Sequence, residues 1–156
     1  PPTPQTMSTT ATKFNRLPLH HAAKANDTTA LHQLLQDPAV LSLINARTDH
    51  GHTAVFLAAQ MGHADTVNAL FHTAHADLNL SDNGGLAPLH IAARNGHLAV
   101  LTLLLSLDAN PNQLDHIQWS PLHWACKNNH DDCIALLTEH SSTEVQGTAF
   151  KTWARK

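Results

Sequence analysis

A four-residue segment recurs along the chain at nearly constant spacing, and this periodicity constrains the fold more than any other feature. Its copies begin 36, 34 and 33 residues apart, and they read Leu17-Pro18-Leu19-His20, Thr53-Ala54-Val55-Phe56, Ala87-Pro88-Leu89-His90 and Ser120-Pro121-Leu122-His123. Repetition with a period of about 20 to 50 residues is typical of chains that stack similar units side by side. The sequence therefore predicts an extended repeat array rather than a single closed core.

Each copy carries the local signals of a short helix that begins at the repeated segment. Thr53 and Ser120 are residue types that cap helix N-termini, because their hydroxyls can accept a hydrogen bond from an unpaired helical N–H. Proline follows the first residue in three copies, at a position where a helix needs no N–H donor. Gly62 and Gly96 follow the first helices and permit the left-handed turn that would start a second, antiparallel helix. Each unit is therefore predicted to be a helical hairpin.

The predicted second helices carry apolar residues at helical spacing. These residues are Leu31, Leu34 and Leu35 in the first unit, Val67, Leu70 and Phe71 in the second, Leu101, Leu104 and Leu105 in the third, and Ile134 and Leu137 in the fourth. One hairpin cannot bury such a stripe alone, so neighbouring hairpins must stack to cover it.

The third copy resembles a known family signature. From Ala87 to His97 the sequence is similar to the ankyrin-repeat pattern T-P-L-H-x-A-A-x-x-G-H and departs from it only at the first residue. The resemblance extends from about Lys13 to Glu139. It implies an all-α solenoid of four helix-turn-helix repeats with short hairpin-like loops, the repeats lying at about 13–48, 49–81, 82–114 and 115–139. The first copy is degenerate and the fourth ends before its closing loop, as expected of terminal repeats.

Both ends of the chain differ from the repeats. Residues 1–12 are rich in Pro, Thr and Ser and hold almost no apolar side chains, so we expect this segment to be disordered. Residues 140–156 are too few for another repeat. Phe150 and Trp153 lie three residues apart among basic residues, a pattern that predicts an amphipathic C-terminal capping helix from Thr148 to Arg155.

Charge and composition disfavour several classes of partner. Nine Lys and Arg against twelve Asp and Glu give a net charge of −3, which offers no general attraction for nucleic acid or for an anionic membrane. The most apolar run, residues 100–107, is far shorter than the roughly 20 residues of a membrane-spanning helix. Two cysteines are too few for a disulfide framework, so we expect an intracellular, cytoplasmic location.

Fourteen histidines suggest metal binding or catalysis, but motif position accounts for six of them. In the family that the sequence resembles, such histidines usually satisfy backbone groups of a neighbouring loop. The six are His20, His90 and His123 within the repeated segment, and His63, His97 and His130 after the first helices. We therefore predict structural roles for them.

Cys126, His130 and Cys133 have a spacing that could be mistaken for three zinc ligands. Both cysteines, however, stand at core positions of the motif, where a free cysteine behaves as a small buried apolar residue, and a structural zinc requires a fourth ligand. The sequence carries no phosphate-binding loop, hydrolase nucleophile elbow or zinc-protease motif. The prediction is a non-enzymatic chain with no metal, no cofactor and no catalytic residue.

The family resemblance also implies where a partner protein would bind. Ankyrin proteins generally contact partners through the tips of the hairpin-like loops and the exposed ends of the first helices, which line up along one concave face. Matching by position predicts these partner-binding residues: Lys13, Phe14, Arg16, Lys24, Asp49, His50, His52, Gln60, Met61, Asn83, Leu86, Arg94, Asn95, His116, Ile117, Trp119, Trp124, Lys127 and Asn128. Aromatic and apolar side chains grouped with Arg are typical of interface hot spots. We expect one or more partner proteins and a chain that is monomeric on its own.

Two alternatives stay open at this point. Trp119 and Ile117 could pack on each other or on the next tip, since single exposed apolar residues are common. The leading function is a non-enzymatic protein-protein interaction module: an adaptor, scaffold, inhibitor or targeting arm. The alternative is the regulatory or substrate-recruiting portion of a larger enzyme or multidomain protein. The fold itself does not identify a partner.

Overall fold

The computed structural model describes residues 17–155 of the chain, and within them the regular structure is entirely α-helical. Eight helices form four antiparallel pairs. The pairs are α2 (Pro18–Ala25) with α3 (Thr28–Leu34), α5 (Ala54–Met61) with α6 (Ala64–Ala74), α7 (Pro88–Asn95) with α8 (Leu98–Ser106), and α9 (Pro121–Asn128) with α10 (Asp131–His140). Two further helices, α4 (Pro38–Leu41) and α11 (Thr143–Trp153), lie outside these pairs.

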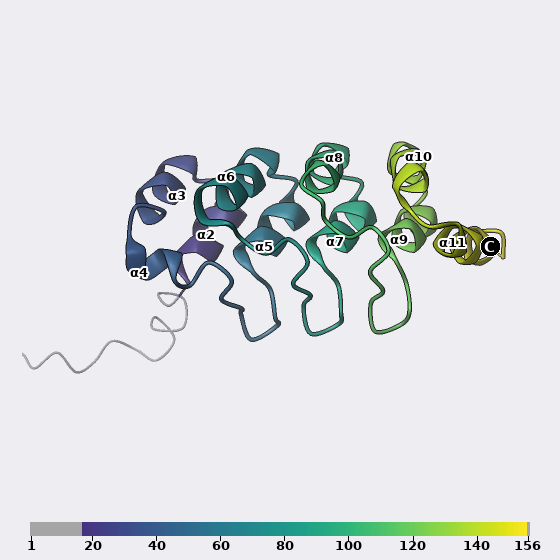
Figure 1. Ribbon diagram of the computed structural model, residues 1–156, viewed down its shortest axis with the longest axis horizontal. Coiled ribbons are helices and arrows are strands. Elements are labelled where there is room, and N and C mark those ends of the chain that lie inside the picture. Colours follow the sequence, from purple (N-terminus) through teal and green to yellow (C-terminus); the bar gives the residue numbers. More distant parts are fainter. Residues whose placement is uncertain (1–16, 156) are drawn as a thin grey trace, which may run out of the picture.

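The helix pairs stack in chain order along the long axis of the molecule (Figure 1). The helices α2, α5, α7 and α9 form an inner row, and α3, α6, α8 and α10 form an outer row. The loops that lead into α5, α7 and α9 all project to the same side. This arrangement confirms the predicted all-α repeat solenoid.

Each inner helix ends at a residue with left-handed backbone conformation, as predicted for Gly62 and Gly96. Asn26, Gly62, Gly96 and Asn129 end the inner helices with φ values of 54°, 80°, 73° and 56°. At two of these positions glycine is also required because the next helix pair approaches closely. A Cβ on Gly62 would lie 2.8 Å from Nδ1 of His97, and one on Gly96 would lie 2.7 Å from Nδ1 of His130.

Small side chains let the inner helices meet, and leucines of the outer row seal the core. Ala58, Ala59, Ala92 and Ala93 are fully buried between inner helices, and the leucines predicted to line the outer helices include Leu70, Leu104 and Leu137, which are buried as well. The core is continuous from the first pair to the last. Burial between neighbouring units, rather than within one unit, therefore stabilises the stack.

The two predicted helix caps have different outcomes. The Thr53 hydroxyl accepts a hydrogen bond from the Phe56 N–H at 3.1 Å, as predicted. Ser120 is the N-cap residue of α9, as predicted, but its hydroxyl lies 2.8 Å from Nδ1 of His123 instead of bonding a helical N–H. The histidine ring competes for the serine hydroxyl, and the serine N–H bonds to the same ring nitrogen.

The longer spacing after the first copy arises from an inserted helical turn. The outer helix α3 ends at Leu34, and Asp37 then caps α4 by accepting from the Ala39 N–H at 2.9 Å. Pro38 occupies the first position of α4, where proline is well tolerated. The sequence showed the longer spacing of 36 residues but not that the extra residues form a separate helix.

A ladder of asparagine side chains holds neighbouring loops in register. In each step an asparagine Oδ1 accepts from a backbone N–H of the next loop: Asn45 from Asp77 at 2.9 Å, Asn79 from Asn110 at 2.9 Å, and Asn112 from Ser142 at 2.8 Å. The chain therefore follows the repeat geometry as far as Ser142.

The C-terminal helix α11 differs in detail from its prediction. It begins at Thr143, five residues earlier than expected, because Ser142 provides an N-cap that the spacing of Phe150 and Trp153 did not reveal. It packs against α9 and buries Val145 and Ala149. Phe150 and Trp153, which suggested the helix, stay 36% and 46% exposed.

The predicted disordered segment, residues 1–12, lies outside the described residues, and so do the first residues of the predicted first repeat. The proposed boundaries of the repeats and of the C-terminal segment stay predictions.

Candidate functional site

Three hydrogen-bonded loop tips form one edge of the molecule. The first tip is Thr48–His52, the second is Asp82–Leu86, and the third is Asp115–Trp119. In each tip the first residue donates its N–H to the carbonyl of the last residue at 2.9 Å. The left-handed positions that close these tips are Gly51, Gly85 and Gln118.

The tips are joined to one another through the backbone. The Asn83 N–H donates to the His50 carbonyl, and the His116 N–H donates to the Gly84 carbonyl, both at 3.1 Å. The Asn83 amide adds a bond to the Asp49 carbonyl at 2.8 Å. The three tips therefore form a continuous row rather than independent loops.

The motif histidines fasten helices to tips, as predicted. His20 in α2 places Nε2 2.9 Å from the Ala46 carbonyl and 3.0 Å from the His52 carbonyl. His90 in α7 places Nε2 3.1 Å from the Trp119 carbonyl, while its Nδ1 accepts from the Ala87 N–H at 3.1 Å. The carbonyl acceptors require a proton on Nε2 of both rings, and the donor at Nδ1 of His90 requires that ring to be neutral.

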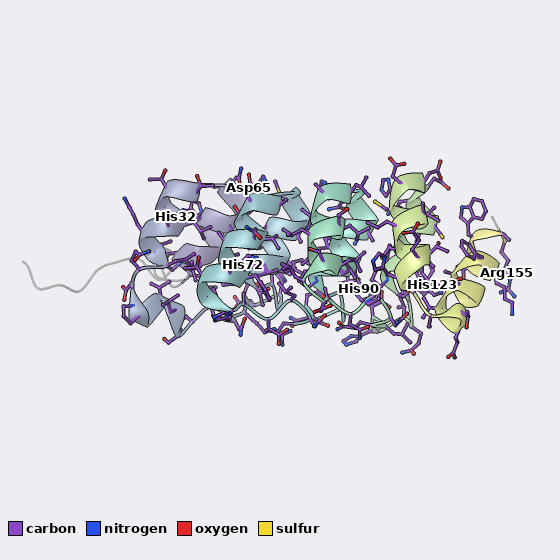
Figure 2. All side chains as sticks on the ribbon, turned by 45° about the horizontal axis from the view of Figure 1, so that its top comes forward. His32, Asp65, His72, His90, His123 and Arg155 are labelled. Carbon is purple, nitrogen blue, oxygen red and sulfur yellow. The ribbon has the colours of Figure 1, made fainter. Side chains whose placement is uncertain are left out.

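Burial favours this neutral form. It lowers the pKa of His20, His90 and His123 below the ordinary histidine value, because a charged imidazole loses its hydration there. Figure 2 shows His90 and His123 at matching places in neighbouring units, both on the side of the tips. These rings therefore act as fixed hydrogen-bonding pieces of the scaffold.

The histidines that follow the inner helices join adjacent pairs at the other end. His63, His97 and His130 place Nε2 3.2, 3.0 and 3.0 Å from the carbonyls of Lys24, Gln60 and Arg94, respectively. The predicted bonds to a neighbouring unit are present for five of the six motif histidines, whereas His123 bonds only Ser120 of its own unit.

Two tryptophans and two cations meet on the inner side of the third and fourth pairs. Trp119 and Trp124 contact each other edge to face, with ring centres 5.0 Å apart. The Arg94 guanidinium lies 5.0 Å from the Trp124 ring centre, and the Lys127 ammonium lies 5.0 Å from that of Trp119. We call these four residues the cation–aromatic cluster. All four were predicted as binding residues, and the structure brings them together.

A buried carboxylate holds this cluster in place. Asp115 is 3% exposed, and its Oδ1 accepts from the backbone N–H groups of Ile117 and Trp119 at 3.0 and 2.9 Å. Its Oδ2 accepts from the Trp124 indole N–H at 2.8 Å. The sequence analysis did not single out Asp115, although Asp82 occupies the same place 33 residues earlier and likewise closes its tip.

The alternative packing for Trp119 is partly realised. Its ring is half-buried and stacks on His123 with ring centres 6.0 Å apart, in addition to its contact with Trp124. Ile117 is 60% exposed. Trp119 is therefore partly a structural residue, whereas Ile117 stands free of the core.

Three predicted asparagines already have structural partners. The amide groups of Asn95 and Asn128 donate to the carbonyls of Gln60 and Arg94 at 3.0 and 2.7 Å, and Asn83 bonds the first tip as described. Met61 stands at the position that corresponds to Asn95, and its side chain is 45% exposed. At this position an exposed thioether side chain therefore replaces an amide that would bond the preceding unit.

The remaining predicted residues fall into three groups. Lys24, Asp49, His50 and His116 are exposed, whereas Gln60 and Leu86 are half-buried. His52 is also half-buried and stacks on Phe56 at 4.5 Å, with Nε2 3.8 Å from Oδ2 of Asp82. Burial lowers the pKa of His52, and the Asp82 carboxylate opposes that shift. Lys13, Phe14 and Arg16 lie outside the described residues.

Cys126 and Cys133 lie in the core, as the motif predicted. Burial raises the pKa of the Cys133 thiol, so this thiol is protonated and a poor metal ligand or nucleophile. Among residues 17–155 no group of three or more His, Cys, Asp or Glu side chains is placed to hold a metal ion.

The sequence did not predict one surface hollow between the fourth helix pair and α11. It has a volume of about 170 Å³ and lies between Trp119, His123 and Lys127 on one side and Thr152 and Trp153 of α11 on the other. No repeat motif covers α11, so nothing in the sequence places its residues beside the fourth pair.

The sequence comparisons agree with this geometry. A family model described as "Ankyrin repeats (3 copies)" matches residues 5–82 and 70–149, which together cover most of the chain. This chain belongs to the ankyrin-repeat family. Ankyrin repeats are in general protein-protein interaction modules, and the family is generally non-catalytic.

Similar curated proteins include three of very different kinds. "Ankyrin repeat-containing protein ITN1" of Arabidopsis thaliana is 32% identical over 121 residues, which is 65% of this chain and 20% of the relative. "60 kDa lysophospholipase" of Mus musculus is 54% identical over 48 residues, covering 31% of this chain and 8% of the relative. "Transient receptor potential cation channel subfamily A member 1" of Homo sapiens is 34% identical over 93 residues, covering 60% and 8%. The aligned part of this ankyrin chain thus spans a fifth or less of each relative.

The helices of this ankyrin chain are short. Within residues 17–155, none is long and apolar enough to cross a membrane.

Proposed function

We propose that this ankyrin chain binds a partner protein through its row of tips and the inner helices, with the contact centred on the cation–aromatic cluster. The observation that carries this proposal is the cluster itself. Two tryptophans with two cations over their rings lie half-exposed beside an isoleucine that is 60% exposed. Such combinations of aromatic, Arg and apolar side chains are enriched in interface hot spots.

Preorganisation strengthens the proposal. Asp115 fixes the Trp124 indole and the third tip through three hydrogen bonds, so the surface loses little conformational freedom when a partner docks. Met61 adds an exposed apolar side chain further along the inner row. The surface we propose therefore runs from Met61 to Ile117, with Arg94, Trp124 and Lys127 between them in space.

The chain itself we infer to be non-enzymatic and without a cofactor, monomeric on its own, and adapted to protein rather than nucleic acid. The residues that could suggest catalysis have other tasks: the six motif histidines bond backbone carbonyls or cap helices, and both cysteines are buried. Two free thiols also suit a reducing, cytoplasmic location.

A second candidate rests on the relatives. The aligned parts of the lysophospholipase and of the cation channel are 8% of each, so ankyrin repeats of this kind occur as small portions of larger proteins. This chain could in the same way recruit a substrate or regulator for an enzyme. The reading frame around the coding sequence distinguishes the two, since only the second requires a flanking catalytic domain.

Affinity capture from a lysate of the source cells tests the proposed surface. The double variant Arg94→Ala with Ile117→Ala removes two exposed side chains of the surface without opening the core. The matched control is Asn68→Ala with Leu98→Ala, which removes exposed side chains from the outer helices. We expect the first variant to lose the captured protein, with binding weakened by about 2 kcal/mol or more, and the control to keep it. Equal capture by both variants and by the unmodified chain contradicts this placement.

A further inference from the structure

The row of tips ends one tip short of the inner helices. His20 in α2 and His90 in α7 each bond the tip of the following unit, but no tip follows α9 within residues 17–155. The last unit lacks a tip because the segment that follows its rung of the asparagine ladder is too short. Ten residues, 111–120, separate Asn110 from the start of α9, whereas Ser142 at the corresponding rung caps α11 directly. The last inner helix therefore carries the groups that receive a tip without having one.

Two backbone-binding groups are left unused at this end. Nδ1 of His123 accepts from the Ser120 N–H at 3.1 Å, as His90 does from Ala87, so the proton of the neutral ring lies on Nε2. In His90 this N–H donates to a tip carbonyl, and in His123 it has no partner among the described residues. The Ile117 carbonyl likewise corresponds to that of Gly84, which accepts from the next tip, and it has no such partner within residues 17–155.

These two groups face one place. In the preceding unit a single tip satisfies both equivalents, because His116 bonds Gly84 and Trp119 bonds His90. A stretch of four residues therefore spans the donor and the acceptor. Beside them lies the hollow of about 170 Å³ lined by Trp119, His123, Lys127, Thr152 and Trp153. An extended segment that replaced the tip could place a side chain there.

Charge at this end is divided between the two rows. The inner side presents Arg94 and Lys127, and α11 adds Lys151, with Arg155 directly after it at the far end of the molecule (Figure 2). The acidic residues of the last pair, Asp131, Asp132 and Glu139, all lie on the outer helix α10. Asp115 of the third tip is buried with its oxygens bonded, and Glu144 is exposed in the first turn of α11, at the opposite end of that helix from Lys151 and Trp153. The inner end is thus positive although the whole chain carries a net charge of −3.

We propose that an extended acidic segment of the partner protein docks at this end in place of the missing tip. Its backbone carbonyl accepts from His123 Nε2, its backbone N–H donates to the Ile117 carbonyl, and an acidic side chain enters the hollow beside Lys127 between the walls formed by Trp119 and Trp153. The inference rests on the proposed function, whose surface it extends and for which it specifies the chemistry of the partner. It also gives α11 a second role, since Thr152 and Trp153 form one wall of the site.

Selection from a displayed library of random ten-residue peptides tests this assignment, ten residues being the length of the segment 111–120 that carries the third tip. Peptides retained by the unmodified chain are expected to be enriched in Asp and Glu. The variant Lys127→Glu should abolish that enrichment. Asn68→Glu is the control, because Asn68 is exposed on the outer helix α6, away from the inner helices, and should leave the enrichment unchanged.

The affinity of variants of the chain for one selected acidic peptide, measured by fluorescence anisotropy, then shows where the peptide binds. His123→Asn keeps an acceptor for the Ser120 N–H but removes the Nε2 donor, and Trp153→Ala removes a wall without touching the buried face of α11. Each substitution is expected to lower the affinity for the peptide roughly tenfold. Phe150→Ala, an exposed aromatic residue on the same helix that does not line the hollow, should have no effect.

The outcomes separate this inference from the proposed function. Peptides that bind independently of Lys127, His123 and Trp153 but are lost with Arg94→Ala and Ile117→Ala overturn the missing-tip site and leave the proposed surface standing. A library that yields no peptide above background overturns the site, while capture of the partner still tests the surface. A dimer in solution that dissociates on Lys127→Glu shows that the occupant is a second copy, which also overturns the proposal.

Discussion

The second and third tips are fastened to their preceding helices in different ways. The third tip is bonded by His90, whose Nε2 reaches the Trp119 carbonyl. The second tip has no such histidine, because Phe56 stands at the equivalent position and is 2% exposed. There, Arg47 donates to the Ser81 carbonyl at 2.6 Å, and Asn83 bonds the first tip twice.

This difference shows what the stack requires of a motif residue. The position needs a planar ring that fills the space beside the tip, and Phe56 meets that need through its stack with His52 at 4.5 Å. Hydrogen bonds that hold the tip are a separate requirement. At the second tip, side chains of the loops, Arg47 and Asn83, supply these bonds in place of a histidine. The repeat therefore tolerates loss of the histidine only where other donors replace it.

The largest expected effect comes from exchanging the two rings. His90→Phe leaves the buried Ala87 N–H without a partner and removes one of the two bonds to the Trp119 carbonyl, which keeps the bond from the Asp115 N–H. We expect it to lower the free energy of unfolding by about 3 kcal/mol. Phe56→His removes no hydrogen bond and should cost about 1 kcal/mol or less. Urea denaturation followed by circular dichroism measures both. Equal costs would show that the two tips do not depend on different contacts.

A smaller loss is expected where two units approach over a glycine. Gly96 has a φ of 73°, and an added Cβ would lie 2.7 Å from Nδ1 of His130, so Gly96→Ala should cost about 2 kcal/mol. Gly147→Ala is the matched control, because Gly147 lies inside α11 with nothing within 4 Å of an added Cβ. It should raise stability by about 0.5 to 1 kcal/mol. Thermal unfolding of both variants compares them, and a neutral Gly96→Ala contradicts the close approach.

Acid should weaken the stack by less than either destabilising substitution. The folded-state pKa values of His20, His90 and His123 are lowered by burial, whereas the unfolded chain binds protons with the ordinary histidine pKa of about 6.5. The stability contributed by the neutral rings is therefore complete above that pH and is lost as the pH falls towards the folded-state values. Urea midpoints measured from pH 7.5 to 5 should decrease, and less steeply for His90→Phe. A midpoint that rises on acidification contradicts the neutral, carbonyl-bonded rings.

The smallest loss is expected at the replacement contact on the second tip. Arg47 is exposed, and Arg47→Ala removes its bonds to the carbonyls of Gly51 and Ser81, which should cost about 0.5 to 1 kcal/mol. In the Phe56→His background the cost should shrink, because the new ring can reach the second tip. A double-mutant cycle by chemical denaturation measures this coupling. Strict additivity would show that Arg47 does not substitute for the histidine.

The parts of the fold that repeat could be predicted from the sequence. The periodic segment indicated the inner helices, the left-handed turns and the five bridging histidines, because each depends on residues within one unit or on identical neighbours. The start of α11 could not be found in this way, since it depends on the bond between Asn112 and Ser142 across two loops. The burial of Val145 in place of Phe150 follows from how α11 packs on α9, which no repeat specifies.

The residues of the candidate site could be predicted from the sequence, but their arrangement could not, for the same reason. The sequence identified Arg94, Trp119, Trp124 and Lys127 one by one from their motif positions, but not that they meet. Their meeting depends on Asp115, whose carboxylate orients both the third tip and the Trp124 indole. Trp153 could not be assigned because its place beside the fourth pair is set by the packing of α11.

Hydrogen exchange measured by mass spectrometry, with and without the captured partner protein, tests the central claim most directly. If the partner docks on the inner C-terminal end, protection should concentrate in peptides that cover residues 113–128 and 150–155, while the outer helices α6 and α8 exchange as in the free chain. Protection confined to α6, α8 or α10, with the third tip and the cation–aromatic cluster unchanged, would contradict the account.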